Sequence, residues 1–224
     1  MRPLPAALAF VAAAAFAEQP VIVHEEPMHR MLLETAALHV LDLAIPPAAV
    51  TKLHTHRSPI FYVTIVSGPV RLQEDGKDWV APQYRAGRPG DVQVNESYFS
   101  APLTHRVENA GSDTIRSILL LNERDAPAFE GDAALPGTPG LDTAWFQQSR
   151  IELAPGAMLD SPGLRIPAFL VMATDAYVTV EYRSSELLIG AVRAGDVVPV
   201  ADGVGFTVWN RGDTPATLIA VAPR

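Results

Sequence analysis

The chain has 224 residues, with 17 basic side chains against 25 acidic ones and a formal net charge of −8 at neutral pH. An acidic chain without basic runs is a poor candidate for nucleic-acid binding, which requires clustered lysine and arginine. The sequence has no cysteine, which excludes disulfides, thiolate catalysis and cysteine-ligated zinc. Any bound metal must therefore be held by histidine, aspartate, glutamate or similar ligands.

Residues 1–17 have the pattern of a cleaved secretory signal peptide. Arg2 supplies a positive charge, an alanine-rich apolar stretch runs from Ala6 to Phe16, and the segment ends in a small-x-small sequence at Ala17. The stretch is shorter than the roughly 20 residues that span a bilayer; a buried N-terminal helix is the alternative. We expect cleavage after Ala17 and a periplasmic or secreted mature chain, in which no segment is long and apolar enough to cross a membrane.

Residues 18–125 are expected to form the first of two domains, built from short strands. Segments rich in valine, isoleucine and aromatic residues alternate with glycine, proline, asparagine or aspartate, as in all-β proteins. Helical periodicity is weak, with Met28–Leu38 as the best candidate helix, and 20 prolines argue against long helices. Six strands are predicted: Leu38–Ile45, Ile60–Val66, Val70–Gln73, Asp91–Val94, His105–Glu108 and Ile115–Leu121.

Residues 126–140 contain three prolines and three glycines, which predicts a linker to a second domain at residues 141–224. The second domain repeats the style of the first. Its predicted strands are Phe169–Ala173, Tyr177–Tyr182, Leu187–Ile189, Asp196–Val200, Phe206–Trp209 and Thr217–Val221.

The two domains look like copies of each other. At one constant offset of 108, three segments match, namely Pro47 with Pro155, Phe61-Tyr62-Val63 with Phe169-Leu170-Val171, and Arg85-Ala86-Gly87 with Arg193-Ala194-Gly195. Val107–Gly111 matches Val208–Gly212 at an offset of 101, so the first domain should hold seven extra residues between Arg88 and Arg106. Two repeats are too few for a solenoid, and a pair of similar barrels or sandwiches is the economical interpretation.

The first domain carries a histidine pattern that indicates a metal centre. His54 and His56 alternate in front of an apolar strand, so both imidazoles can point to one face. His105 opens another strand 49 residues beyond His56. Three neutral imidazoles on neighbouring strands can bind one divalent transition metal (Fe²⁺, Mn²⁺, Ni²⁺, Cu²⁺ or Zn²⁺) and leave positions for water and substrate.

The second domain serves as an internal control. The two offsets place Pro162, Leu164 and Phe206 at the positions of the three histidines, so the repeated fold does not need imidazoles there. This weakens the alternative that the three are ordinary strand and core residues. Asn109 and Asn210 occur in both copies, which favours a turn role for them. The remaining histidines are interpreted as structural: His24, His29 and His39.

Two groups of residues resemble the two motifs of the cupin superfamily. The first motif, with a His-x-His, a glutamate and a glycine, is similar to His54-Thr55-His56 with Phe61 and Gly68; the second, with Gly-Asp, a proline, a histidine and an asparagine, is similar to Gly90-Asp91 with Pro102, His105 and Asn109. The resemblance covers nearly the whole mature chain and implies a bicupin, with two tandem double-stranded β-helix (jelly-roll) barrels and a degenerate second copy. Cupins include dioxygenases, isomerases, lyases, storage proteins and sensors, so the fold does not fix the function.

The sequence departs from these motifs in two places. The glutamate ligand of the first motif falls on Phe61, and what remains is similar to the three-histidine sites of cupin thiol and diketone dioxygenases. Phe61 would then be an apolar wall beside an open coordination position. The gap between Gly90 and His105 is longer than usual and contains Glu96 and Tyr98, which either reach the metal or pocket mouth or lie in a surface loop.

These features support two main hypotheses. The first is a metal-dependent enzyme of the oxygenase or isomerase type that acts on a small organic molecule at the three-histidine site. The second is a non-catalytic periplasmic module that binds a metal or small molecule, because no general acid or base is evident beside the histidines. A metal-free barrel is a third, and the chain could be a monomer or a homodimer.

Overall fold

The computed structural model describes residues 18–84, 87–183 and 188–224. The predicted signal peptide, Arg85-Ala86 and Leu187 lie outside the described residues. Within them the chain forms strands and two short 3₁₀ helices, η1 (Val23–Glu25) and η2 (Ser97–Phe99), which confirms the all-β prediction. No helix of this part of the chain has the length and apolar character to cross a membrane.

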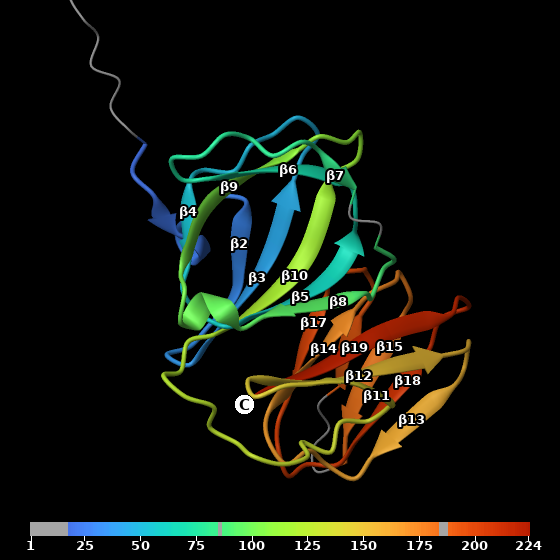
Figure 1. Cartoon of the computed structure of the whole chain (residues 1–224). Coiled ribbons are helices and arrows are strands. Elements are labelled where there is room, and N and C mark those ends of the chain that lie inside the picture. Colours follow the sequence, from blue (N-terminus) through green and yellow to red (C-terminus); the bar gives the residue numbers. More distant parts are fainter. Residues whose placement is uncertain (1–17, 85–86, 184–187) are drawn as a thin grey trace, which may run out of the picture.

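The first half of the chain forms two five-stranded sheets that enclose a barrel (Figure 1). One sheet has the order β1 (Val21–Ile22), β4 (His54–His56), β9 (Leu103–Asn109), β6 (Pro69–Glu74) and β7 (Gln83–Tyr84). The other has the order β2 (His29–Glu34), β3 (Leu38–Ile45), β10 (Ile115–Asn122), β5 (Ile60–Val66) and β8 (Val92–Asn95).

The second half repeats this arrangement with one strand fewer among the described residues. Its five-stranded sheet has the order β11 (Thr138–Asp142), β12 (Phe146–Leu153), β19 (Ala216–Pro223), β14 (Ala168–Met172) and β17 (Val197–Val200). Its four-stranded sheet has the order β13 (Met158–Ser161), β18 (Phe206–Asn210), β15 (Val178–Tyr182) and β16 (Leu188–Ala191).

Two segments differ from the sequence-based expectation. The candidate helix at Met28–Leu38 is wrong, because β2 pairs antiparallel with β3; a register shift between Met31 and Leu33 interrupts the alternation that would have revealed the strand. The expected linker at residues 126–140 is partly structured, since β11 begins at Thr138 and Ala133 is fully buried in the core of the second half.

The five-stranded sheets of the two halves pack against each other through their outer faces. The apolar cluster between them includes Val40, Phe61 and Leu120 from the first half and Phe146 and Val221 from the second. Figure 1 shows β5, β8 and β10 on one side of this interface and β14, β17 and β19 on the other. Both barrel interiors therefore lie on the sides of these sheets that face away from the interface.

The strand registers align the two halves residue by residue. Thr64 exchanges backbone hydrogen bonds with Gly90 and Asp91, and Met172 does the same with Gly195 and Asp196. Gly90 and Gly195 also share left-handed φ angles of 84° and 89°, which glycine adopts without strain.

This alignment corrects the sequence comparison. Gly195 corresponds to Gly90, so the predicted match with Gly87 is wrong, and the first half has gained three residues between Gln83 and Gly90. The other four of the seven extra residues lie between Asn95 and His105, in the segment that forms η2.

Candidate metal centre

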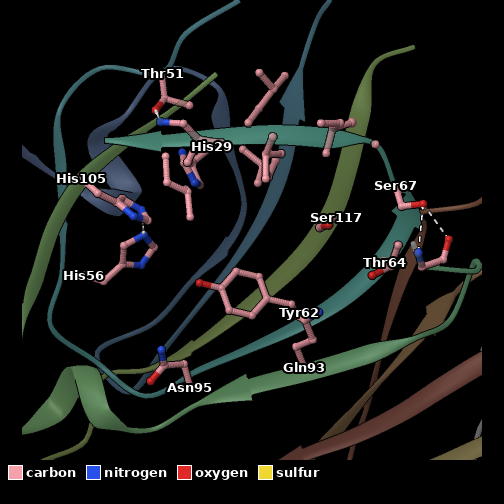
Figure 2. Close-up of a pocket in the computed structure, with 18 of the residues that line it drawn as sticks. His29, Thr51, His56, Tyr62, Thr64, Ser67, Gln93, Asn95, His105 and Ser117 are labelled. Carbon is pink, nitrogen blue, oxygen red and sulfur yellow. Dashed lines mark hydrogen bonds between the residues drawn. The ribbon is translucent and has the colours of Figure 1, made fainter. Parts of the chain in front are cut away.

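A cavity of about 420 Å³ lies inside the first barrel (Figure 2). His54 and His56 reach it from β4, and His105 reaches it from the neighbouring strand β9, where it is paired directly with His54. Alternation along the three-residue strand β4 turns both of its histidines to the same face. The three residues are buried, with 1%, 3% and 9% exposure respectively.

The three imidazoles converge on one point. Their ring centroids are 5.0 Å apart for His54 and His56, 4.8 Å for His54 and His105, and 5.0 Å for His56 and His105. One ligand nitrogen from each lies within 4.8 Å of the other two, and the Nε2 atoms of His56 and His105 are 3.1 Å apart. The structure thus brings together the three residues that the sequence singled out, in an arrangement that can hold a metal ion.

The surroundings keep the imidazoles of His54 and His56 in the neutral form that binds metals. Burial, followed by the nearby His29, lowers the pKa of His54 to about 4. Burial, followed by His105, His54 and His29, lowers the pKa of His56 well below its ordinary value. Nδ1 of His54 donates a hydrogen bond to the Lys52 carbonyl at 2.8 Å, which leaves Nε2 as its ligand atom. Neutral, oriented imidazoles fit a divalent metal.

A fourth histidine, His29, also lines the cavity, although the sequence favours a structural role for it. His29 lies with its ring centroid 5.0 Å from that of His54, and its Nδ1 donates to Glu26 Oε2 at 2.7 Å. Glu26 also accepts backbone N–H bonds from Met28 at 2.8 Å and Lys52 at 3.1 Å. Burial alone would raise the pKa of Glu26, but these hydrogen bonds lower it, so the carboxylate is ionised.

The inward direction of the His29 side chain follows from strand β2, which lies in the segment expected to be a candidate helix. His29 opens β2 and pairs with Leu43, whose side chain also lines the cavity. Residues paired across two strands share a face of the sheet, so a strand interpretation would have directed His29 inward.

Phe61 does not line the cavity, in contrast to the expectation that it would form a wall beside the metal. It is fully buried on the outer face of β5, with its ring centroid 5.5 Å from that of Phe146 in the second half. Because side chains alternate along a strand, its neighbour Tyr62 faces inward instead. Figure 2 shows the Tyr62 ring projecting into the cavity, with its hydroxyl on the side of His56 and His105.

Tyr98 and Glu96, the two candidates between Gly90 and His105, lie in different surroundings. Tyr98, in η2, lines the cavity and stacks on His56 with ring centroids 4.9 Å apart and planes 28° apart. Glu96 is not among the described residues that line the cavity, and its Oε1 accepts a hydrogen bond from the backbone N–H of Trp145 at 3.3 Å. The insertion therefore contributes a phenol to the site, whereas its carboxylate contacts the second half.

Comparisons with known proteins identify the architecture. No family model matches the sequence, and neither does any curated protein. Solved structures do match: the cupin 2 conserved barrel domain protein from Leptotrichia buccalis has a TM-score of 0.50 at 10% identity, covering 87% of this chain and 88% of that one. The chain has the cupin fold.

Two enzymes share this cupin fold at similar distances. The oxalate decarboxylase from Lactobacillus farciminis has a TM-score of 0.54 at 14% identity, covering 86% of this chain and 83% of that one. The salicylate 1,2-dioxygenase from Pseudaminobacter salicylatoxidans has a TM-score of 0.55 at 12% identity, covering 89% of this chain and 77% of that one. At these identities the likeness establishes the fold alone.

The second half carries no metal ligand at the positions of the three histidines, as the sequence predicted, although the corresponding residues differ. Phe206 pairs with Ser161 as His105 pairs with His54, so Ser161 and not Pro162 corresponds to His54. By the same register, Gly163 and not Leu164 corresponds to His56. The cause is one extra residue between Val50 and His54 in the first half, which a fixed sequence offset cannot detect.

The replacement extends beyond the histidines to the rest of the cavity wall. The polar residues that line the cavity of the first half include five on β5, β8 and β10, namely Tyr62, Thr64, Gln93, Asn95 and Ser117. The matching strand pairs of the second half carry five buried apolar residues: Leu170, Met172, Val198, Val200 and Leu218. The same ladder thus encloses a cavity with polar groups in its wall in one half and a cluster of buried apolar side chains in the other.

Proposed function

We propose that this cupin is a metal-dependent enzyme of the oxygenase or isomerase type, which acts on a small organic molecule in the cavity of the first half. The observation that carries the proposal is the contrast between the two interiors. An interior filled with apolar side chains would make this fold more stable than an interior with a cavity and buried polar groups, since both of these cost stability. The histidines and polar residues of the first half are therefore best explained by chemistry or binding.

The three histidines would hold one divalent transition metal, and imidazole ligands suit Fe²⁺, Mn²⁺, Ni²⁺, Cu²⁺ and Zn²⁺ alike. When bound by neutral ligands the ion keeps its full positive charge and supplies Lewis-acid chemistry or, as iron, reaction with O₂. Tyr98 covers one side of this centre by stacking on His56. The Tyr98 ring would shield His56 from water and narrow the access to the metal.

The cavity wall favours a small neutral substrate with an apolar body and one or two oxygen atoms. Its volume of about 420 Å³ suits a small molecule. Among the described residues that line it there is no lysine or arginine to pair with an anion, and Asp91 is its one acidic residue. Tyr62 and Gln93 offer hydrogen-bonding groups, while Leu43 and Ile115 contribute apolar surface. Phenols and diketones have this combination.

Glu26 and His29 supply a proton acceptor, the group that was missing from the sequence interpretation. An ionised carboxylate can only accept, so the bond between Glu26 and His29 places the proton of a neutral imidazole on Nδ1. Nε2 then carries the lone pair. Because His29 lines the cavity beside His54, this nitrogen can take a proton from a substrate hydroxyl, with Glu26 holding the ring in place.

The oxygenase form is tested by O₂ consumption of protein loaded with Fe²⁺ without air and then mixed with phenols, diketones or thiols. We expect turnover with at least one class and a loss of at least about 100-fold in His105→Phe, which introduces the residue of the second half. Thr104→Val is the matched control. Thr104 is adjacent on β9 and bonds Thr55 at 2.9 Å, away from the histidines, so activity should persist.

The isomerase form is tested by product analysis of the same mixtures without O₂. Tight retention of a molecule with no turnover in either condition would contradict the enzyme and favour a binding module. Unchanged metal content in His105→Phe would contradict the site itself.

The leader-like residues 1–17 support the additional proposal that the mature chain functions in the periplasm or outside the cell. N-terminal sequencing of protein from a periplasmic fraction should then begin at Glu18. A chain that retains Met1 in the cytoplasm would contradict it.

A further inference from the structure

A second group of metal-ligating side chains lies in the first half and shares no residue with the three-histidine site. It consists of His24 on η1, His39 on β3 and Glu123, which directly follows β10. One ligand atom from each lies within 4.8 Å of the other two. Three separate elements of the barrel thus contribute one ligand each.

The contacts within this group are close. The ring centroids of His24 and His39 are 4.5 Å apart in an edge-to-face arrangement. Nδ1 of His39 lies 3.2 Å from Glu123 Oε1, and the other oxygen of Glu123 accepts a hydrogen bond from the Ser58 hydroxyl at 2.6 Å. Glu123 is therefore held in position by Ser58, with one oxygen directed at the imidazoles.

Two nitrogens in this group lack hydrogen-bond partners among the residues that the structure describes. Nδ1 of His24 and Nδ1 of His39 are both buried and unpaired. The 3.2 Å approach of Glu123 to His39 is not aligned as a hydrogen bond, although the distance qualifies as an ion pair. Buried polar atoms are almost always satisfied by protein, water or an ion. Two unpaired imidazole nitrogens beside a carboxylate indicate a missing cation.

The group is separate from the cavity, although β3 contributes to both. His39 and Leu41 lie on the same face of this strand, and Leu41 packs with Val23 and Ile60 in a buried apolar cluster. Leu43, two residues further on, lines the cavity. Leu41 therefore lies between His39 and the cavity along the strand.

We propose that His24, His39 and Glu123 bind a second divalent transition metal that fastens the N-terminal segment to the barrel. Two imidazoles and one carboxylate form a donor set that suits Zn²⁺ and Fe²⁺. The ion would connect η1 to the ends of β3 and β10. Since η1 leads directly into Glu26 and His29, it would also fix the segment that carries this pair.

The test is a calorimetric titration of metal-free protein with Zn²⁺. Wild type should bind two ions per chain, and the double variant His54→Ala/His105→Ala should still bind one. In that double variant, His24→Ala should abolish the remaining binding and the rise in melting temperature that Zn²⁺ produces. Glu123→Gln should weaken the remaining Zn²⁺ binding at least tenfold while leaving a side-chain oxygen for Ser58. This second variant tests the proposal if His24→Ala does not fold.

The matched control is Glu34→Gln in the same background. Glu34 is exposed and lies 3.9 Å from the other ring nitrogen of His39, outside the ligand group, so Zn²⁺ binding should not change. A double variant that binds no Zn²⁺ would overturn the second site and leave the cavity site intact. Loss of one ion in wild-type His24→Ala, with no loss in His54→Ala/His105→Ala, would instead support the second site and contradict the first.

Discussion

The two halves differ in their interiors far more than in the faces by which they contact each other. In the first half, Thr64 and Ser117 pair across β5 and β10 beside the cavity, and in the second half Met172 and Leu218 pair at the same place in the ladder and are fully buried. On the outer faces, by contrast, Phe61 and its counterpart Phe169 are both buried in the apolar cluster between the halves.

This difference separates residues that maintain the fold from residues that the fold does not need. The outer faces keep their apolar character in both copies because each sheet has to cover the other. The inner faces are free to diverge, since the ladder accommodates either a cluster of buried apolar side chains or a cavity with polar groups in its wall.

The largest expected effect tests the shared outer face. Phe61→Ala and Phe169→Ala should each lower the free energy of unfolding by about 3–5 kcal/mol, because both leave a cavity in the cluster between the halves. Metal content per folded chain should not change, since Phe61 faces away from the histidines. Urea denaturation and metal analysis measure the two quantities.

The control for this pair is Val192→Ala, an exposed position in the second half that should change stability by less than about 0.5 kcal/mol. Loss of metal from folded Phe61→Ala protein, without loss of stability, would mean that Phe61 contributes to the metal site. It would contradict the assignment of Phe61 to the shared outer face.

A smaller effect is expected when the cavity of the first half is given the side chains of the second. Thr64→Met/Ser117→Leu places the Met172–Leu218 pair at its counterpart position. Filling part of the cavity should lower kcat/KM roughly 10-fold to 100-fold, with unchanged metal content, because the substrate loses space and hydrogen-bonding groups. Thr64→Val/Ser117→Ala, which removes the hydroxyls without filling the space, separates these two causes. Unchanged kinetics in the filled variant would show that substrate binds elsewhere.

Most strands of the fold were predictable because they combine β-branched residues with clear punctuation. Ile60–Val66 and Ile115–Asn122 are of this kind, and their apolar side chains are largely buried. The strands that sequence analysis missed lack the pattern. β12 buries Gln148 and Ser149 among its apolar residues, and β2 contains a register shift, so neither shows regular alternation.

The three histidines were predictable because their spacing matches a motif, but their neighbours were not. Motif spacing placed a ligand position at Phe61, whereas the pleat of β5 turns Tyr62 inward. His29 was missed because its strand was not recognised. The correspondence of His54 with Ser161 depends on one extra residue that only the pairing of strands reveals.

The smallest effect concerns a charge in the sheet that the first half presents to the second. Asp42 is buried, which would raise the pKa of its carboxyl, but hydrogen bonds from Arg116 and Arg30 lower it below 3.8. Arg116 also donates to the Ala194 carbonyl of the second half at 2.7 Å; the counterpart of Asp42 is Arg150, which donates to the Gly90 carbonyl at 3.1 Å. Each sheet thus sends an arginine across the interface, and only one of the two is held by a buried carboxylate.

Because the folded state binds the Asp42 proton more weakly than the unfolded state does, the carboxylate stabilises the fold above pH 3.8. That stabilisation is lost as the pH falls through the lower folded-state pKa. In Asp42→Asn the urea midpoint should be lower at neutral pH and should fall less between pH 4 and pH 2 than in wild type. If the urea midpoint of the variant falls as steeply between pH 4 and pH 2 as that of wild type, other carboxylates control the acid destabilisation. Arg116 would then need no buried carboxylate to hold the interface, and would resemble Arg150, whose charged partner is the exposed Glu152.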